Sequence, residues 1–260
     1  MISGAPDLVR SGLKAVLFDL DGVVTRTARV HARAWEQLFD EFLAGQTGAP
    51  ERLRPFRLPE DYLAYLDGKP RYEGVQAFLL ARGIDLPWGD PGDPPDAATV
   101  CGLGNRKNRI FRRVLEEQGV EVFESTVALI RALRSEGIGA ACVSSSKNGM
   151  AVLEQAGLVE LFDVVVDGRD LERERLRGKP HPDAYLRAAA RLGVPPAEAA
   201  VVEDAIAGVA AGRAGSFGLV IGVDRGVGRA ALAAAGADVV VGDLGELPLP
   251  GQSGSASGGT

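Results

Sequence analysis

The chain has 260 residues, 46% of them hydrophobic, and its 29 basic and 35 acidic residues give a formal net charge of −6. This charge disfavours a duplex nucleic-acid binder, because neutralising phosphates requires a basic surface, and it suits a small soluble substrate better. The chain has two cysteines and no apolar stretch near the roughly 20 residues that span a bilayer, so we expect a cytoplasmic monomer without disulfides or a membrane anchor.

The first predicted element is a buried strand at residues 15–18, where the apolar sequence AVLF leads directly into Asp19 and Asp21. A continuous apolar run of this length is typical of a parallel strand that is covered on both faces. A carboxylate at the end of such a strand is costly unless solvent or a metal ion reaches it. The pattern therefore raises the question of what Asp19 and Asp21 hold.

Residues 31–119 are predicted to contain amphipathic helices and no convincing buried strand. Turns rich in Pro and Gly separate the helices, and residues 86–100 are so rich in Pro, Gly and Asp that they predict an exposed loop. We interpret residues 31–119 as a helical cap domain inserted after the first strand. The expected helices are His31–Leu43, Leu58–Leu66, Val75–Arg82 and Lys107–Gln118.

From residue 120 onward, strand-sized apolar runs alternate with helical patterns, which predicts a doubly wound, Rossmann-like α/β core with a parallel sheet. We assign residues 1–30 and 120–247 to this core. Residues 248–260 are rich in Gly and Ser and are expected to be a disordered tail. The further strands are expected at 139–143, 163–166, 199–202, 218–223 and 237–241, and the helices at 127–135, 150–156, 182–192, 206–214 and 230–235.

Clusters of polar residues directly follow the predicted strands, so the carboxyl ends of parallel strands would bring them to one edge of the sheet. Each cluster alone has an ordinary explanation, because acids cap helices, serine runs form turns and a single lysine is commonly solvated. Their convergence on one edge is harder to explain as loops. The clusters are Asp19 with Asp21, the segment VSSSKNG with Ser144, Lys179 in GKPHPD, and Glu203 with Asp204.

Together these residue types suit phosphoryl transfer. Carboxylates from two strand ends supply the oxygen ligands that Mg²⁺ prefers, and a lysine with hydroxyl and N–H groups can hold a phosphate. The sequence has no GxxxxGK[ST] nucleotide loop, so the phosphoryl donor is expected to be the substrate itself. One aspartate can attack phosphorus and store the group as an acyl phosphate, while an acid two residues later transfers the proton.

The segments FDLDGVVT, VSSS, GKPHPD and VEDA resemble, in this order, the four motifs of the haloacid dehalogenase superfamily of phosphotransferases. The resemblance covers residues 13–247 and is greatest for the β-phosphoglucomutase-like subfamily, whose helical cap is inserted at the corresponding place. It implies Asp19 as the nucleophile and a Mg²⁺ ligand, and Asp21 as the general acid and base with its carbonyl on the metal. It also implies that Glu203 and Asp204 bind the metal and that Ser144 and Lys179 bind the transferring phosphoryl group.

Other segments match the mutases of that subfamily rather than simple phosphatases. The segment TARVHARAW has Thr27 and His31 where the mutases have a Thr and a His, and SSSKN resembles the loop that holds the distal phosphate of a sugar. The resemblance therefore implies isomerisation of β-glucose 1-phosphate or a similar sugar phosphate. The substrate-binding residues that it implies are Thr27, His31, Gly68, Arg71, Lys107, Ser145, Ser146, Lys147 and Asn148.

Other interpretations stay open at this point. If water completes the same covalent reaction, the protein is a sugar-phosphate phosphatase, which needs one phosphate site only. A catalytically inactive interaction module is a more remote possibility.

Two single residues also have another interpretation. Lys107 lies in a run of arginines that is typical of a solvated helix face. Arg26 stands where the subfamily often has an acid, which adds a positive charge near the cleft.

Overall fold

The computed structural model describes residues 6–9, 11–66 and 69–248. Residues 249–260, which make up most of the expected disordered tail, lie outside the described residues. The same holds for Gly68, one of the residues expected to bind substrate.

The chain divides into two compact units. The core unit comprises Met1–Thr25 and Val122–Thr260, and the inserted unit comprises Arg26–Glu121. The domain limits that the sequence suggested, at residues 30/31 and 119/120, stay a prediction. Each unit is described by itself below.

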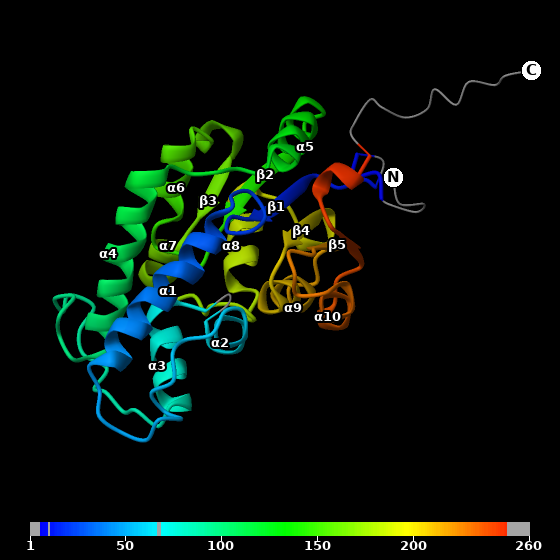
Figure 1. Cartoon of the computed structure of the whole chain (residues 1–260). Coiled ribbons are helices and arrows are strands. Elements are labelled where there is room, and N and C mark those ends of the chain that lie inside the picture. Colours follow the sequence, from blue (N-terminus) through cyan, green and yellow to red (C-terminus); the bar gives the residue numbers. More distant parts are fainter. Residues whose placement is uncertain (1–5, 10, 67–68, 249–260) are drawn as a thin grey trace, which may run out of the picture. The chain divides into compact units, whose positions relative to one another are not determined.

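In the described part of the core unit, six parallel strands form one sheet in the order β3-β2-β1-β4-β5-β6 (Figure 1). The central strand β1 (Ala15–Asp19) is buried along its whole length. Its Leu17 is in register with Ala141 on one side and Val201 on the other. Burial on both faces explains the continuous apolar runs of the sequence, and the predicted parallel sheet is confirmed. The other strands are β2 (Gly139–Val143), β3 (Val164–Val166), β4 (Ala199–Glu203), β5 (Leu219–Val223) and β6 (Val239–Val241).

Helices cover both faces of the sheet. On one face, Tyr185 and Ala188 of α8 (Asp183–Leu192) pack in one apolar cluster with Leu17 and Val201 of the strands. Helix α5 (Glu124–Ser135) contacts β2 and lies on the opposite side of the sheet from α8 (Figure 1). The remaining helices of the core unit are α6 (Gly149–Ala156), α7 (Gly168–Glu174), α9 (Ile206–Ala214) and α10 (Arg229–Ala235).

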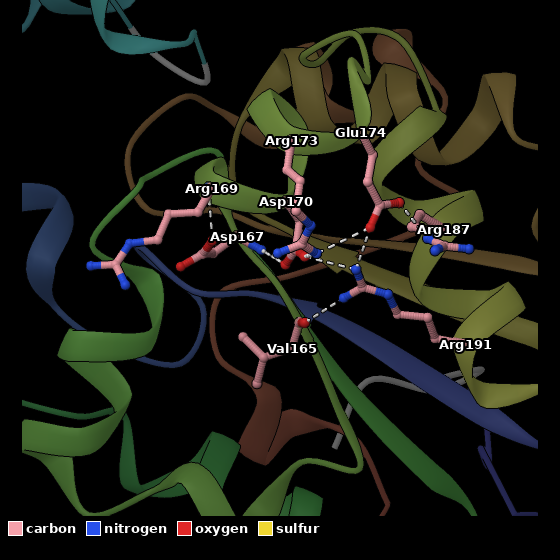
Figure 2. A network of polar contacts seen from close by, with 8 residues as sticks. All are labelled: Val165, Asp167, Arg169, Asp170, Arg173, Glu174, Arg187 and Arg191. Carbon is pink, nitrogen blue, oxygen red and sulfur yellow. Dashed lines mark hydrogen bonds and ion pairs between the residues drawn. The ribbon is translucent and has the colours of Figure 1, made fainter. Parts of the chain in front are cut away.

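Helix α7 was not predicted, because its sequence GRDLERE has almost no apolar periodicity. Polar contacts stabilise it instead. Asp167 caps its start by accepting a hydrogen bond from the backbone N–H of Arg169 at 2.8 Å. Figure 2 shows Arg191 of α8 reaching Asp170 and Glu174 of α7, with an N–O distance of 2.7 Å to each. This network fixes α7 on α8, next to the end of β3.

The described part of the inserted unit is helical, as predicted. Residues 86–99 contain neither helix nor strand, in agreement with the expected loop. In the described ranges, none of the helices combines the length and the apolar character that crossing a bilayer requires. The helices of this unit are α1 (Thr27–Ala44), α2 (Glu60–Tyr65), α3 (Arg71–Ala81) and α4 (Val100–Gln118).

Helix α4 begins at Val100, a full two turns earlier than its apolar pattern indicated. Thr99 caps it by accepting a hydrogen bond from the N–H of Gly102 at 2.9 Å. Glycine disfavours a helix in a sequence-based prediction. Here, however, a methyl group on Gly102 would overlap the carbonyl oxygen of Ala97, and one on Gly104 would overlap the ring of Tyr72. The glycines are therefore needed for close packing of the loop and α3 against α4.

A buried acid with arginine partners stabilises the inserted unit. Asp61 accepts hydrogen bonds from Arg54 at 2.8 Å, from Arg82 at 2.9 Å and from the backbone N–H of Arg57 at 3.0 Å. Asp61 is 3% exposed and Arg82 is 5% exposed. Burial by itself raises the pKa of Asp61, but the hydrogen bonds from Arg54 and Arg57 and the arginine charges outweigh it and hold the pKa below its usual value.

We expect Asp61→Ala to lower the free energy of local unfolding of the inserted unit by about 3–5 kcal/mol, because it leaves the buried Arg82 without its carboxylate. Amide hydrogen exchange in α2 and α3 measures this change, with Asp96→Ala, at an exposed acid of the same unit, as the control. The folded-state pKa of Asp61 is depressed, so the stabilisation is present above the unfolded pKa of about 3.9 and is lost as pH falls through the folded value. Equal exchange in both variants would contradict this role.

Candidate active site

Asp19 and Asp21 lie at the carboxyl end of the central strand. β1 ends on Asp19, which is 6% exposed, and the chain then turns back on itself. In this turn the N–H of Thr25 donates to the carbonyl of Leu20 at 2.9 Å, and the N–H of Gly22 donates to the carbonyl of Thr25 at 2.8 Å. The turn keeps the half-buried Asp21 close to the strand end instead of letting the chain run on into solvent.

Lys179, in the loop that precedes α8, lies between two carboxylates. Its ammonium group donates to Asp19 Oδ1 and to Glu203 Oε1. Glu203 is held at both oxygens, because Tyr185 donates to Oε1 at 3.1 Å and the N–H of Ala205 donates to Oε2 at 2.8 Å. The side chains of Lys179 and Glu203 are 3% and 1% exposed. Glu203 and its partners thus fix the lysine against Asp19.

Three acids of this edge could hold a metal ion. Asp19, Glu203 and Asp204 each offer a carboxylate oxygen, and these atoms all lie within 4.8 Å of one another. The group is assembled because β1 and β4 are neighbours in the sheet and end at the same edge. Lys179 brings one positive charge to three carboxylates, so an excess of negative charge remains for a cation to neutralise. The oxygen donors fit a hard divalent cation such as Mg²⁺.

Two glycines allow the chain to approach these acids closely. A Cβ on Gly208 of α9 would overlap the carboxylate of Glu203, and a Cβ on Gly22 would overlap that of Asp204. Gly22 also has φ = +103°, a backbone conformation that side chains other than glycine rarely adopt. A larger residue at either position would therefore displace an acid of the carboxylate group.

Burial and charge perturb the ionisation of the site. Burial raises the pKa of Asp19 well above its usual value and the charges of Glu203 and Asp21 raise it further, while the ammonium of Lys179 opposes them. For Lys179, burial favours the neutral amine, but the charges of Asp19 and Glu203 outweigh it and raise the pKa well above that of a solvated lysine. Lys179 therefore remains a cation at neutral pH. Burial, followed by the charge of Glu203, also raises the pKa of the Tyr185 phenol.

The loop after β2 brings hydroxyl groups to the same edge. Ser144 is 1% exposed, and its Oγ lies 3.4 Å from Asp21 Oδ2. Ser144 Oγ accepts a hydrogen bond from the N–H of Ser146 at 3.1 Å, and Ser146 Oγ accepts one from the N–H of Asn148 at 3.2 Å. These side chain to backbone bonds keep the loop compact at the start of α6. The structure thus places Ser144 beside Asp21.

Helix α7 supports this loop from the side of β3. The N–H of Gly168 donates to the carbonyl of Ser146 at 3.0 Å. Lys147 donates to Glu172 of α7 at 2.7 Å, so its charge is held next to the loop. Ser145 is half-buried in the same loop, and its part in substrate binding stays a prediction.

Within the inserted unit, Lys107 and His31 contact each other. Lys107 Nζ lies against His31 Nδ1, and the imidazole ring stacks on Phe111 with 4.0 Å between the ring centres. Lys107 is 3% exposed, and its Nζ lies 4.9 Å from the centre of the Trp35 ring. Burial separates Lys107 from Arg109 and the other exposed arginines that follow it, so it is not part of their solvated face.

Among the described residues of this unit, two more that are expected to bind substrate lie at the starts of helices. Thr27 is the first residue of α1 and is 1% exposed. Arg71 is the first residue of α3, and its guanidinium donates to Asn108 of α4 at 3.0 Å. The bond brings the Arg71 guanidinium to Asn108, which directly follows Lys107 in α4.

Several residues of the site had no signal in the sequence. Tyr185 belongs to the apolar face of α8, and its pattern predicted a core residue only. Gly208 sits inside a helix, where glycine is unfavourable but does not by itself indicate a contact, and Glu172 lies in the unpredicted helix α7. Tyr185 and Glu172 reach Glu203 and Lys147 across 18 and 25 residues of the chain, and Gly208 meets Glu203 only because β4 and α9 pack together.

Comparison with known proteins places the chain among phosphate-handling enzymes. A family model described as haloacid dehalogenase-like hydrolase matches residues 13–215. The chain is similar to a β-phosphoglucomutase of Mycobacterium tuberculosis, with 49% identity over 253 residues that cover 95% of this chain and 94% of the relative. A β-phosphoglucomutase of Bacillus subtilis is 34% identical and covers 91% of this chain and 92% of its own length. The crystal structure of β-phosphoglucomutase from Clostridium difficile has the same fold, with a TM-score of 0.70, 24% identity, and coverage of 91% of this chain and 93% of that one.

We expect Gly208→Ala to weaken Mg²⁺ binding by about tenfold or more, because the added methyl group displaces the Glu203 carboxylate, and disturbing the support of a metal site typically costs 10- to 100-fold in affinity. Isothermal titration calorimetry measures this change. Gly212→Ala on the same helix is the matched control, since its methyl group meets the side chains of Val201 and Val220 instead. Equal Mg²⁺ affinity in the two variants would show that Glu203 does not take part in binding the ion.

Proposed function

Because this chain belongs to the haloacid dehalogenase-like hydrolase family, we propose that it transfers a phosphoryl group through an aspartyl phosphate formed on Asp19. Its reaction is that of a β-phosphoglucomutase, the name borne by its relatives from M. tuberculosis and B. subtilis, and it converts β-glucose 1-phosphate to glucose 6-phosphate. The observation that carries the proposal is the position of Asp19, which is buried at a strand end, in contact with Lys179 and within the carboxylate group.

The first step forms the aspartyl phosphate, with a sugar bisphosphate as the phosphoryl donor. A carboxylate oxygen of Asp19 attacks phosphorus, and the bond between phosphorus and the sugar oxygen breaks as Asp21 gives that oxygen a proton. Lys179 and the hydroxyl of Ser144 stabilise the charge on the phosphoryl oxygens. Burial raises the pKa of Asp19, and the ammonium of Lys179 opposes this by stabilising the carboxylate form that attacks phosphorus.

Mg²⁺ is the cofactor of this proposal. The carboxylates of Asp19, Glu203 and Asp204 would hold it, together with the carbonyl of Asp21. When bound, Mg²⁺ supplies positive charge to the carboxylates and to the phosphoryl oxygens. Tyr185 contributes by orienting Glu203 through its hydroxyl group.

The second step transfers the phosphoryl group from Asp19 to the 6-hydroxyl of β-glucose 1-phosphate. Asp21 now acts as the base and takes the proton of that hydroxyl, whose oxygen attacks phosphorus and releases the Asp19 carboxylate, so that glucose 1,6-bisphosphate forms. The bisphosphate then turns round and gives its 1-phosphate to Asp19 as in the first step, which releases glucose 6-phosphate. Because the sugar carries a second phosphate during both transfers, a second phosphate site is required. We assign this second site to Arg71, Ser146, Lys147 and Asn148.

The inserted unit carries further residues to which we assign substrate binding. We assign sugar contacts to Thr27, Gly68 and Lys107, and we assign His31 to orienting Lys107. The contact between His31 and Lys107 and the burial of both Lys107 and Thr27 support this assignment, because buried polar side chains keep a defined geometry.

A phosphatase is the alternative, in which water rather than a sugar hydroxyl attacks the aspartyl phosphate. The mutase is favoured by the loop at residues 145–148, whose hydroxyl, amide and ammonium groups could hold a second phosphate that hydrolysis does not need. The 49% identity with a named β-phosphoglucomutase agrees with it. Cys101 and Cys142 are both buried and are not joined in a disulfide, which fits a reducing compartment, and we assign the reaction to the cytoplasm.

The proposed reaction is tested by supplying β-glucose 1-phosphate, Mg²⁺ and a trace of glucose 1,6-bisphosphate, and by measuring glucose 6-phosphate and free phosphate together. We expect glucose 6-phosphate as the main product, and a phosphoryl group on Asp19 in mass spectra of acid-quenched protein. Asp19→Asn should lower turnover by at least about 10³-fold, because the nucleophile is lost. The control is Asp96→Asn, at an exposed acid of the inserted unit. Release of one free phosphate per substrate without any isomer would establish the phosphatase instead.

We expect His31→Ala to lower kcat by about tenfold, because Lys107 loses the group that orients it. The affinity for Mg²⁺ should stay within about twofold of that of the unaltered protein, since the imidazole is not among the oxygen ligands that the ion prefers. Steady-state kinetics and calorimetry give the two values. His181→Ala, at the exposed second histidine of the chain, is the control. An equal loss of turnover and of Mg²⁺ affinity would contradict the assignment of His31 to substrate orientation.

A further inference from the structure

The loop that follows Asp21 is held from outside at three consecutive carbonyl groups. Arg225 Nε donates to the carbonyl of Gly22 at 2.9 Å, the hydroxyl of Thr126 donates to that of Val23 at 2.7 Å, and the N–H of Phe123 donates to that of Val24 at 2.9 Å. All these residues belong to the core unit. The loop is thus positioned from two segments of the chain, the start of α5 and the loop that follows β5.

Arg225 connects these segments. It lies in the loop between β5 and α10, and its guanidinium carbon is 3.7 Å from the centre of the Phe123 ring. Its Nη1 also donates to the carbonyl of Gly242 at 3.0 Å, after the last strand of the sheet. One planar, multidentate side chain therefore joins the turn after Asp21, the start of α5 and the end of β6, a task for which guanidinium is better suited than ammonium.

Gly22 links the bond from Arg225 to the acids of the site, Asp21 and Asp204. Gly22 directly follows Asp21 in the chain, and its Cα faces the carboxylate of Asp204 so closely that a methyl group would not fit. The Gly22 carbonyl is separated from the Asp21–Gly22 peptide group only by the Cα of Gly22, so a shift of this carbonyl is passed on to Asp21 through the backbone. Displacements of about 1 Å in a reacting group can cost roughly 100-fold in rate.

We propose that Arg225 is a positioning residue of the active site, which fixes the carboxyl group of Asp21 by holding the carbonyl of Gly22. Arg225 does not contact the reacting atoms. Its effect on turnover rests on the proposed function, whereas its effect on the loop does not.

Arg225→Met tests the structural part of this proposal. Methionine can still pack on Phe123 but donates no hydrogen bond. The matched control is Arg229→Met, because Arg229 also reaches the C-terminal part of the sheet, through the carbonyl of Val240 at 2.6 Å. We expect amide exchange of Val24 and Thr25, which donate to Leu20 inside the turn, to accelerate by about tenfold in Arg225→Met and to stay unchanged in Arg229→Met. Equal exchange in the two variants overturns the proposal.

The kinetic part uses the same pair of variants together with Arg225→Lys. We expect Arg225→Met to lower kcat by about 10- to 100-fold while KM stays within about twofold, and Arg225→Lys to restore part of kcat, because one donor remains. The melting temperatures of the two methionine variants separate this effect from a general loss of stability. Faster loop exchange with unchanged kcat overturns the positioning role.

Failure of the proposed function gives a different result. Absence of glucose 6-phosphate and of aspartyl phosphate in the unaltered protein refutes the proposed function, and the exchange data then still decide whether Arg225 holds the loop.

Discussion

The arrangement of the candidate active site depends on two ion pairs, which the buried ammonium of Lys179 forms with Asp19 and Glu203. Moving a carboxylate out of water costs several kcal/mol, and two of them at neighbouring strand ends also repel each other. The ammonium of Lys179 opposes both effects, and its own charge is stabilised in return. Removing one partner from such a buried ion pair typically lowers the free energy of unfolding by about 3–5 kcal/mol. Tyr185 and the N–H of Ala205 also donate to Glu203 and keep it in place beside the lysine.

The sheet makes this arrangement possible. Because β1 and β4 run parallel and end at the same edge, residues that are far apart in the chain, such as Asp19 and Glu203, come within a few ångströms of one another. The turns after the strands then have to be compact. Gly22 permits this after β1, and side chain to backbone bonds of Ser144 and Ser146 do so after β2.

The periodic elements and the polar clusters were predictable, whereas the support of the site was not. The apolar runs predicted the strands well, since burial on both faces leaves a continuous signal. Helix α7 escaped prediction because ion pairs with α8, rather than an apolar stripe, stabilise it (Figure 2). The start of α4 was placed too late because its glycines, unfavourable for an isolated helix, serve the packing against Ala97 and Tyr72.

The sequence by itself determined the fold class and predicted that Asp19, Ser144, Lys179 and Glu203 gather at one edge of the sheet, because hydrophobic periodicity and the order of these residues can be read directly from the chain. Tertiary structure alone decided how these groups interact: that Lys179 bridges two acids, that Lys107 is buried against His31 rather than solvated, and that Arg225 holds the turn after Asp21. Such contacts join segments far apart in the sequence, and their free energies depend on burial and distance, which only the folded chain defines.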